Sequence, residues 1–127
     1  MTDAEFARTF ERGDIPNRDF HHREHLRLAW AYLAECPSLD AAIVRIVTAI
    51  RRFAAAAGAA EKYHETLTIF WMKHLELIRA RLDAGADFDE VLRANPRLLD
   101  KDLPLAFYSR ERLFSDEARR TWVEPEP

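Results

Sequence analysis

The sequence predicts an all-α fold: a small helical bundle of about four main helices, followed by a C-terminal wrap of short helices and turns. Three observations lead to this prediction. Apolar residues recur at spacings of three and four along most of the chain. Glycine or proline follows each of these runs, and Ser, Thr or Asp precedes several of them. No segment shows the two-residue alternation that is typical of a β-strand.

The first two helices are bounded by a capping box and a proline. Thr2 and Glu5 form the capping box, which begins a short helix that ends at Gly13. The turn-rich sequence IPNRD connects this helix to the next. The second helix is expected over residues 20–35, because Pro37 prevents its continuation.

The next two helices complete the bundle core. Ser38 is the expected N-cap of a long third helix that ends at Gly58. The fourth helix is expected over residues 61–84, and Gly85 ends it. Residues 20–84 thus form the part of the bundle that carries the histidines discussed below.

Residues 86–124 are expected to form the C-terminal wrap. Asp87 and Glu90 begin a short helix that ends at an Asn-Pro pair, and Ser109 and Ser115 are expected N-caps of further short turns. This segment is too rich in leucine and aromatic residues for a free tail, so we expect it to pack across the bundle. Only the last five residues, VEPEP, are expected to fray.

Composition narrows the class of protein. The 127 residues are expected to form one domain, residues 1–127. A formal net charge of −3, with the arginines interleaved among acidic residues, argues against a nucleic-acid partner. Cys36 is the only cysteine, which rules out an internal disulfide and a cysteine-based zinc site. No signal peptide or membrane-spanning run is visible, so the expected location is the cytoplasm, without a membrane partner.

The main chemical signal is the position of three of the five histidines. His22 and His25 belong to the run FHHREHLRLAWAYL, and His64 belongs to KYHETLTIFWMKHL. At about 100° per residue, all three lie on the apolar sides of their predicted helices. Three His ligands with an open fourth position are a known arrangement for zinc, and iron, nickel and copper also accept imidazole. The sequence therefore predicts a mononuclear site for one of these divalent transition metals, with His22, His25 and His64 as ligands.

Three residues near His64 are expected to supply the remaining chemistry. Glu61 or Glu65 is the expected fourth ligand or general base, and Thr68 lies one turn after His64, where its hydroxyl would orient bound solvent. A metal in a dry bundle core acts as a Lewis acid or lowers the pKa of bound water. The resulting hypothesis is a small enzyme that acts on a small-molecule substrate by metal-assisted hydrolysis, transfer or oxidation.

Other interpretations of the histidines stay open. A histidine on an apolar face is more often a hydrogen-bonded core residue than a ligand. The main alternative is therefore a non-enzymatic binding or regulatory module with structural core histidines, whose C-terminal wrap meets a partner, and a homodimer is compatible with either hypothesis. His21, Glu24 and His25 also match the H-x-x-E-H pattern of zinc peptidases, but Glu24 falls on the charged side of the helix.

Four sequence motifs carry a resemblance. FHHREHLRLAWAYL, KYHETLT-x-x-W, NPRLLDK-x-LP and YSRERLFSDEAR together resemble those of a family of small bacterial all-helical proteins with no established activity. This resemblance extends over residues 20–125 and transfers no site. More loosely, the histidine content is similar to that of the DinB/YfiT metal-binding bundles. Those bundles carry one histidine on an earlier helix and an H-x-x-x-H pair on a later one, whereas here the clustered histidines come first.

Overall fold

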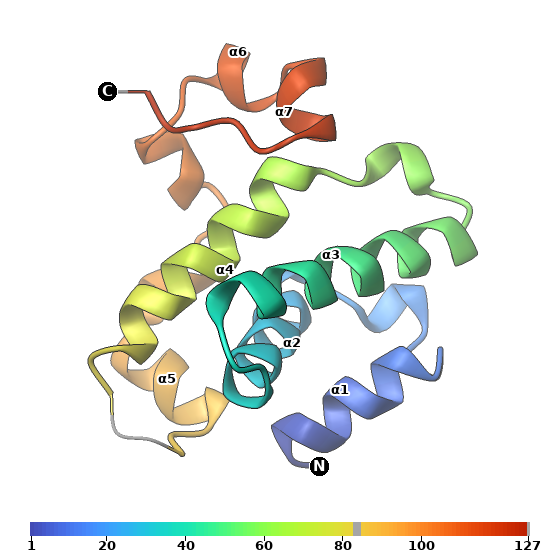
Figure 1. Cartoon of the computed structure of the whole chain (residues 1–127), viewed down its shortest axis with the longest axis vertical. Helices are drawn as coiled ribbons and strands as arrows, with labels where there is room; N and C mark the ends of the chain where they lie inside the picture. Colours follow the sequence, from blue (N-terminus) through green and yellow to red (C-terminus); the bar gives the residue numbers. More distant parts are fainter. Residues whose placement is uncertain (83–84, 127) are drawn as a thin grey trace.

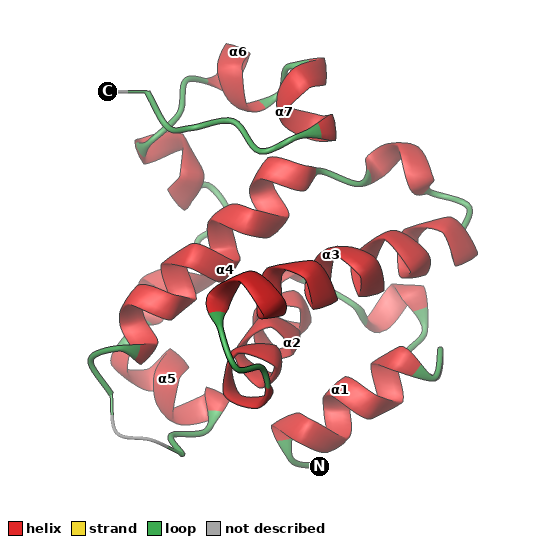
Figure 2. Cartoon of the chain, viewed as in Figure 1, coloured by secondary structure: helices red, strands yellow, loops and turns green. Residues whose placement is uncertain are grey.

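The computed structural model describes residues 1–82 and 85–126, and in them the chain is all-α, without a β-strand. Figure 2 shows helices joined by loops and short turns throughout. The α-helices are α1 (Asp3–Glu11), α2 (His22–Glu35), α3 (Leu39–Ala56), α4 (Glu65–Arg79), α5 (Phe88–Ala94), α6 (Arg110–Leu113) and α7 (Asp116–Arg120). Single 3₁₀ turns cover Asn17–Asp19, Ala60–Lys62, Pro96–Leu99 and Leu103–Ala106. None of the helices within the described ranges is long and apolar enough to cross a bilayer. The predicted fold class is confirmed.

Side-chain caps begin most of the helices, as the sequence predicted. Thr2 and Glu5 form the complete capping box of α1. The other predicted N-caps each accept a backbone N–H from the first turn that follows, and these residues are Ser38, Asp87, Ser109 and Ser115. Gly13 and Gly58 have positive φ angles of 81° and 70° just beyond the ends of α1 and α3, a conformation that favours glycine. Local sequence therefore determines most of the helix boundaries.

Helix α2 is the centre of the bundle and packs against α1, α3 and α4 (Figure 1). Its buried residues are Leu26, Leu28, Ala29, Trp30, Ala31, Tyr32 and Leu33. They belong to a cluster of buried side chains that also includes residues of α1, α3, α4, α5 and the C-terminal wrap. Because burial of apolar surface is the main favourable term in folding, α2 positions the helices around it.

Two helices begin later than the sequence pattern indicated. Helix α2 begins at His22 instead of residue 20. Helix α4 begins at Glu65 instead of residue 61 and ends at Arg79. The predicted end at Ala84 falls in residues 83–84, which lie outside the described residues. The late start of α4 has a physical cause: the His64 side chain accepts the backbone N–H of Leu67, which makes His64 the N-cap of the helix.

The C-terminal wrap is anchored to α4 almost to its end. The expectation that VEPEP frays is wrong at Val123, whose side chain is only 8% exposed. The Thr66 hydroxyl donates to the Thr121 carbonyl at 2.8 Å and accepts the Val123 N–H at 3.1 Å. The Tyr108 hydroxyl donates to the Val123 carbonyl at 2.7 Å. A pattern based on composition could not anticipate these bonds, because each one joins positions far apart in the sequence.

Thr66→Val tests this anchor. The substitution keeps the side-chain volume nearly constant but leaves the buried N–H of Val123 without its acceptor. We expect a loss of about 1 to 3 kcal/mol in the free energy of unfolding, measured by urea denaturation, together with faster hydrogen exchange at the Val123 amide. Thr48→Val is the control, since the Thr48 hydroxyl donates to the Val44 carbonyl within its own helix, α3. Equal losses in the two variants would contradict the anchor.

Candidate functional site

His64 uses both ring nitrogens to hold backbone groups. Nδ1 accepts the N–H of Leu67 at 3.1 Å, and Nε2 lies 2.7 Å from the carbonyl oxygen of Leu113. A backbone N–H can only donate and a carbonyl can only accept, so these partners fix the neutral tautomer with the proton on Nε2. The residue is 8% exposed. Burial lowers the pKa of this imidazole, while the bond to Leu113 acts in the opposite sense. His64 thus caps α4 and fixes the C-terminal wrap through Leu113.

His22 makes the same kind of connection at the other end of the wrap. Its Nε2 donates to the Leu98 carbonyl at 2.9 Å, and its ring meets the Trp71 ring edge-on with centroids 4.7 Å apart. Burial lowers the pKa of His22 as well. Two of the three histidines predicted as ligands therefore connect helices of the bundle to carbonyl groups of residues 86–124.

His25 is the one histidine with an uncommitted buried nitrogen. Its Nε2 is buried and has no hydrogen-bond partner among the described residues, and its ring stacks near Phe20 with centroids 6.1 Å apart. Burial lowers the pKa of His25 to about 4, and the neighbouring His22 adds to the effect. The ring is accordingly neutral at physiological pH and packs as part of the apolar interior.

Two of the three residues expected to complete a metal site bind other groups in the structure. Glu65 accepts the Tyr63 hydroxyl at 2.6 Å and lies 3.5 Å from the Arg51 guanidinium. The Thr68 hydroxyl donates to the His64 carbonyl at 2.9 Å, inside the first turn of α4. Glu61 is an exposed residue of the 3₁₀ turn before α4. Only Glu65 and Thr68 lie next to His64 in α4, and each already has a protein partner.

The predicted ligands do not form a metal-binding group in the described part of the chain. Among residues 1–82 and 85–126, no three His, Cys, Asp or Glu side chains are placed to hold one ion. His22 of α2 and His64 at the N-cap of α4 bond to different carbonyl groups of the wrap, those of Leu98 and Leu113. A site formed by His22, His25 and His64 thus remains a prediction that requires rearrangement of backbone contacts.

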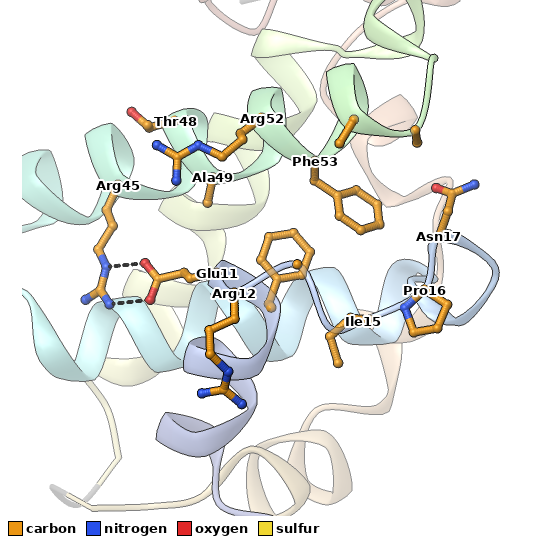
Figure 3. Close-up of a pocket in the computed structure, with 14 residues that line it drawn as sticks. Glu11, Arg12, Ile15, Pro16, Asn17, Arg45, Thr48, Ala49, Arg52 and Phe53 are labelled. Carbon is orange, nitrogen blue, oxygen red and sulfur yellow. Dashed lines mark hydrogen bonds and ion pairs between the residues drawn. The ribbon is translucent and has the colours of Figure 1, made fainter.

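A pocket lies elsewhere, between the C-terminal end of α1 and the C-terminal half of α3 (Figure 3). Its volume is about 580 Å³, within the range of small-molecule sites. Its floor is apolar, with the rings of Phe10 and Phe53 stacked 4.9 Å apart and Ile15 and Ala49 beside them. Phe53 and Ile15 are only partly buried, so apolar surface remains accessible to a ligand.

Charged side chains surround this apolar floor. Arg45 is held by Glu11 at 3.2 Å and by Glu35 at 2.8 Å, and its guanidinium lies 4.2 Å from the centre of the Tyr32 ring. Figure 3 shows the Arg45–Glu11 pair at one side of the pocket, with Phe53 and Ile15 toward the other. Arg12 and Arg52 also line it. The pocket therefore combines an aromatic surface with a rim that carries more positive than negative groups.

The sequence pattern did not identify this pocket, because its apolar residues have the spacing of core residues. One signal was present in the helix lengths. Helix α3 has 18 residues and α1 has nine, so at about 1.5 Å per residue α1 is too short to cover the whole length of α3. The segment that follows α1 contributes Ile15, Pro16 and Asn17 to the lining of the pocket.

Two substitutions of His64 separate the contributions of its two hydrogen bonds to stability. His64→Ala removes both and should lower the free energy of unfolding by about 2 to 3 kcal/mol in urea denaturation. His64→Asn keeps a good N-cap but is too short to reach Leu113, so we expect a loss of only about 1 kcal/mol. Glu61→Ala, at an exposed position of the 3₁₀ turn before α4, is the control. A His64→Ala protein as stable as wild type would refute the structural role.

Stability should also depend on pH through the histidines. The unfolded chain binds protons near pH 6.5, whereas burial lowers the pKa of His22, His25 and His64 in the folded protein, so their contribution is complete above pH 6.5 and is lost as pH falls below it. His25 alone, with its pKa near 4, should remove on the order of 2 kcal/mol between pH 7.5 and pH 5. Urea titrations at these pH values measure the change. A stability that is constant across this interval would contradict the burial of the three rings.

Comparison with known proteins does not assign a family or a function to this chain. Neither the protein-family models nor the curated proteins nor the solved structures gave a match. The function is therefore argued from the two features described above: histidines bound to backbone groups, and an accessible apolar pocket between α1 and α3.

Proposed function

We propose that this protein is a non-enzymatic helical module that binds a small molecule in the pocket between α1 and α3. The observation that carries the proposal is the pocket of about 580 Å³, with its stacked Phe10 and Phe53 rings and its polar rim. Small-molecule sites in proteins are typically concave, mainly apolar and lined by a few oriented polar groups. This pocket has each of these properties.

The walls of the pocket are rigid enough to be preformed. Phe10 and Phe53 each also contact Phe20, with ring centroids 4.7 and 4.9 Å away, so the aromatic floor is part of the core. Arg45 connects α1 to α2 and α3 by binding Glu11 and Glu35 together. A preformed site loses less conformational entropy on binding, which favours affinity for a small ligand.

The histidines have a structural role in this proposal. A metalloenzyme built on His22, His25 and His64 would have to release at least one of the bonds that His64 makes to Leu67 and Leu113. Releasing either bond leaves a backbone group near the buried ring without a partner, which costs about 1 to 3 kcal/mol. Metal binding at these histidines would therefore cost this free energy before any bond to the metal forms. Binding in the pocket requires no such rearrangement.

Titration with 2-naphthol tests the proposal. This uncharged bicyclic aromatic compound matches the floor of the pocket, and a ligand of its size should bind with a dissociation constant on the order of 1 mM. We expect ¹⁵N–¹H chemical-shift changes at the amides of Ile15, Thr48 and Phe53. Changes confined to other parts of the protein would contradict the proposed site.

A pair of substitutions in α3 provides the matched control. Ala49→Phe places a ring in the pocket and should weaken 2-naphthol binding at least about tenfold by steric exclusion. Ala55→Phe adds the same ring at an exposed position of α3 that does not line the pocket, and should leave the affinity unchanged. Equal affinity in the two variants would contradict the assignment even if 2-naphthol binds.

A further inference from the structure

The charges around the α1–α3 pocket are not balanced. Three arginines line it, Arg12, Arg45 and Arg52, and Glu11 is the acidic residue among the lining side chains. Glu11 is already bound by Arg45 through both carboxylate oxygens. The pocket therefore presents positive charge that its own residues do not neutralise. A ligand with negative charge complements this rim, and one with positive charge does not.

The three arginines differ in how far they are committed to protein partners. Arg45 binds Glu11 and Glu35 and lies over the Tyr32 ring. Arg12 pairs with Asp14 at 3.2 Å. Arg52 forms no ion pair or side-chain hydrogen bond with any residue that the structure describes, although its neighbour Arg51 pairs with Glu65. Arg52 is thus the guanidinium that is available to a ligand.

The position of Arg52 relative to the aromatic floor sets the shape of the complementary ligand. Figure 3 shows the Arg52 side chain extending along α3 beside Thr48 and Ala49, while the Phe53 ring lies farther along the helix. An anionic group at Arg52 therefore lies at one side of the pocket, and an apolar body bonded to it reaches Phe53 and Phe10. A planar guanidinium binds a carboxylate through two parallel hydrogen bonds.

We infer that the pocket binds a small apolar carboxylate, with Arg52 holding the carboxylate group and Phe10 and Phe53 contacting an aromatic or aliphatic body. This inference rests on the proposed function, since it names the ligand class of the same pocket. It assigns Arg52 as the residue that determines specificity. The stacked phenylalanines supply affinity that does not depend on charge.

Three probes with one ring system test the charge preference separately from the pocket. They are 2-naphthoate, uncharged 2-naphthol and the cationic (2-naphthyl)methylammonium ion, each titrated into the full chain and followed by ¹⁵N–¹H shifts at the pocket amides. We expect 2-naphthoate to bind about tenfold more tightly than 2-naphthol, because its carboxylate forms a charge-assisted hydrogen bond with Arg52. The cation should bind more weakly than both.

Arg52→Gln and Arg51→Gln form a matched pair of variants. Each removes one positive charge from an exposed position of α3, but only Arg52 lines the pocket. Arg52→Gln should reduce the affinity for 2-naphthoate about tenfold, to the level of 2-naphthol, and change the affinity for 2-naphthol less than about twofold. Arg51→Gln should preserve the preference for the carboxylate.

The outcomes distinguish the inference from the proposed function. If 2-naphthol and 2-naphthoate bind at the pocket with equal affinity, or if Arg52→Gln preserves the preference, the carboxylate inference is overturned while the pocket stands. If none of the three compounds shifts the pocket amides, both the inference and the proposed function are overturned. If 2-naphthoate binds tightly but Ala49→Phe does not weaken it, the anion site lies elsewhere and the inference is overturned.

Discussion

The buried His64 ring holds two backbone groups at once, the N–H of Leu67 and the carbonyl of Leu113, and the arrangement of the C-terminal half depends on it. The first bond determines where α4 begins. The second places α6 against the start of α4, next to the segment whose Val123 backbone is bound by Thr66 and Tyr108. Because one backbone partner can only donate and the other can only accept, the two bonds require the neutral tautomer of His64 with the proton on Nε2.

This constraint divides the molecule into two regions with different roles. In the view of Figure 1, α6 and α7 lie at the upper end, while α1 lies at the lower end. His64 bonds to Leu113 of α6, and His22 of α2 bonds to Leu98 in an earlier part of the wrap. The pocket lies between α1 and α3 and contains no histidine. The polar groups that hold the fold are thus separate from the side chains available to a ligand.

The sequence predicted the helices, whereas the contacts of the histidines depend on the fold, and particular residues explain the difference. Caps such as Thr2, Ser38 and Ser109 act within one turn, so local sequence is sufficient to place them. The helical periodicity also placed His64 on an apolar face, but it could not distinguish a residue inside a helix from its N-cap. That distinction depends on the bond from the Leu67 N–H to the His64 ring, whose other nitrogen is held by Leu113, 49 positions away. The pocket depends likewise on how α1 and the segment after it pack against α3, which the spacing of apolar residues does not specify.

The most direct test of the structural role of the histidines is long-range ¹H–¹⁵N NMR of the imidazole nitrogens at pH 7.5, with and without one equivalent of Zn²⁺. This spectrum reports the protonation and coordination of each ring nitrogen separately. We predict that His64 is the neutral tautomer with the proton on Nε2, and that Zn²⁺ leaves the nitrogens of His22, His25 and His64 unchanged. Zinc-dependent shifts at all three rings, with loss of the His64 Nε2 proton, would contradict the structural role of the histidines and support the metal site that the sequence predicted.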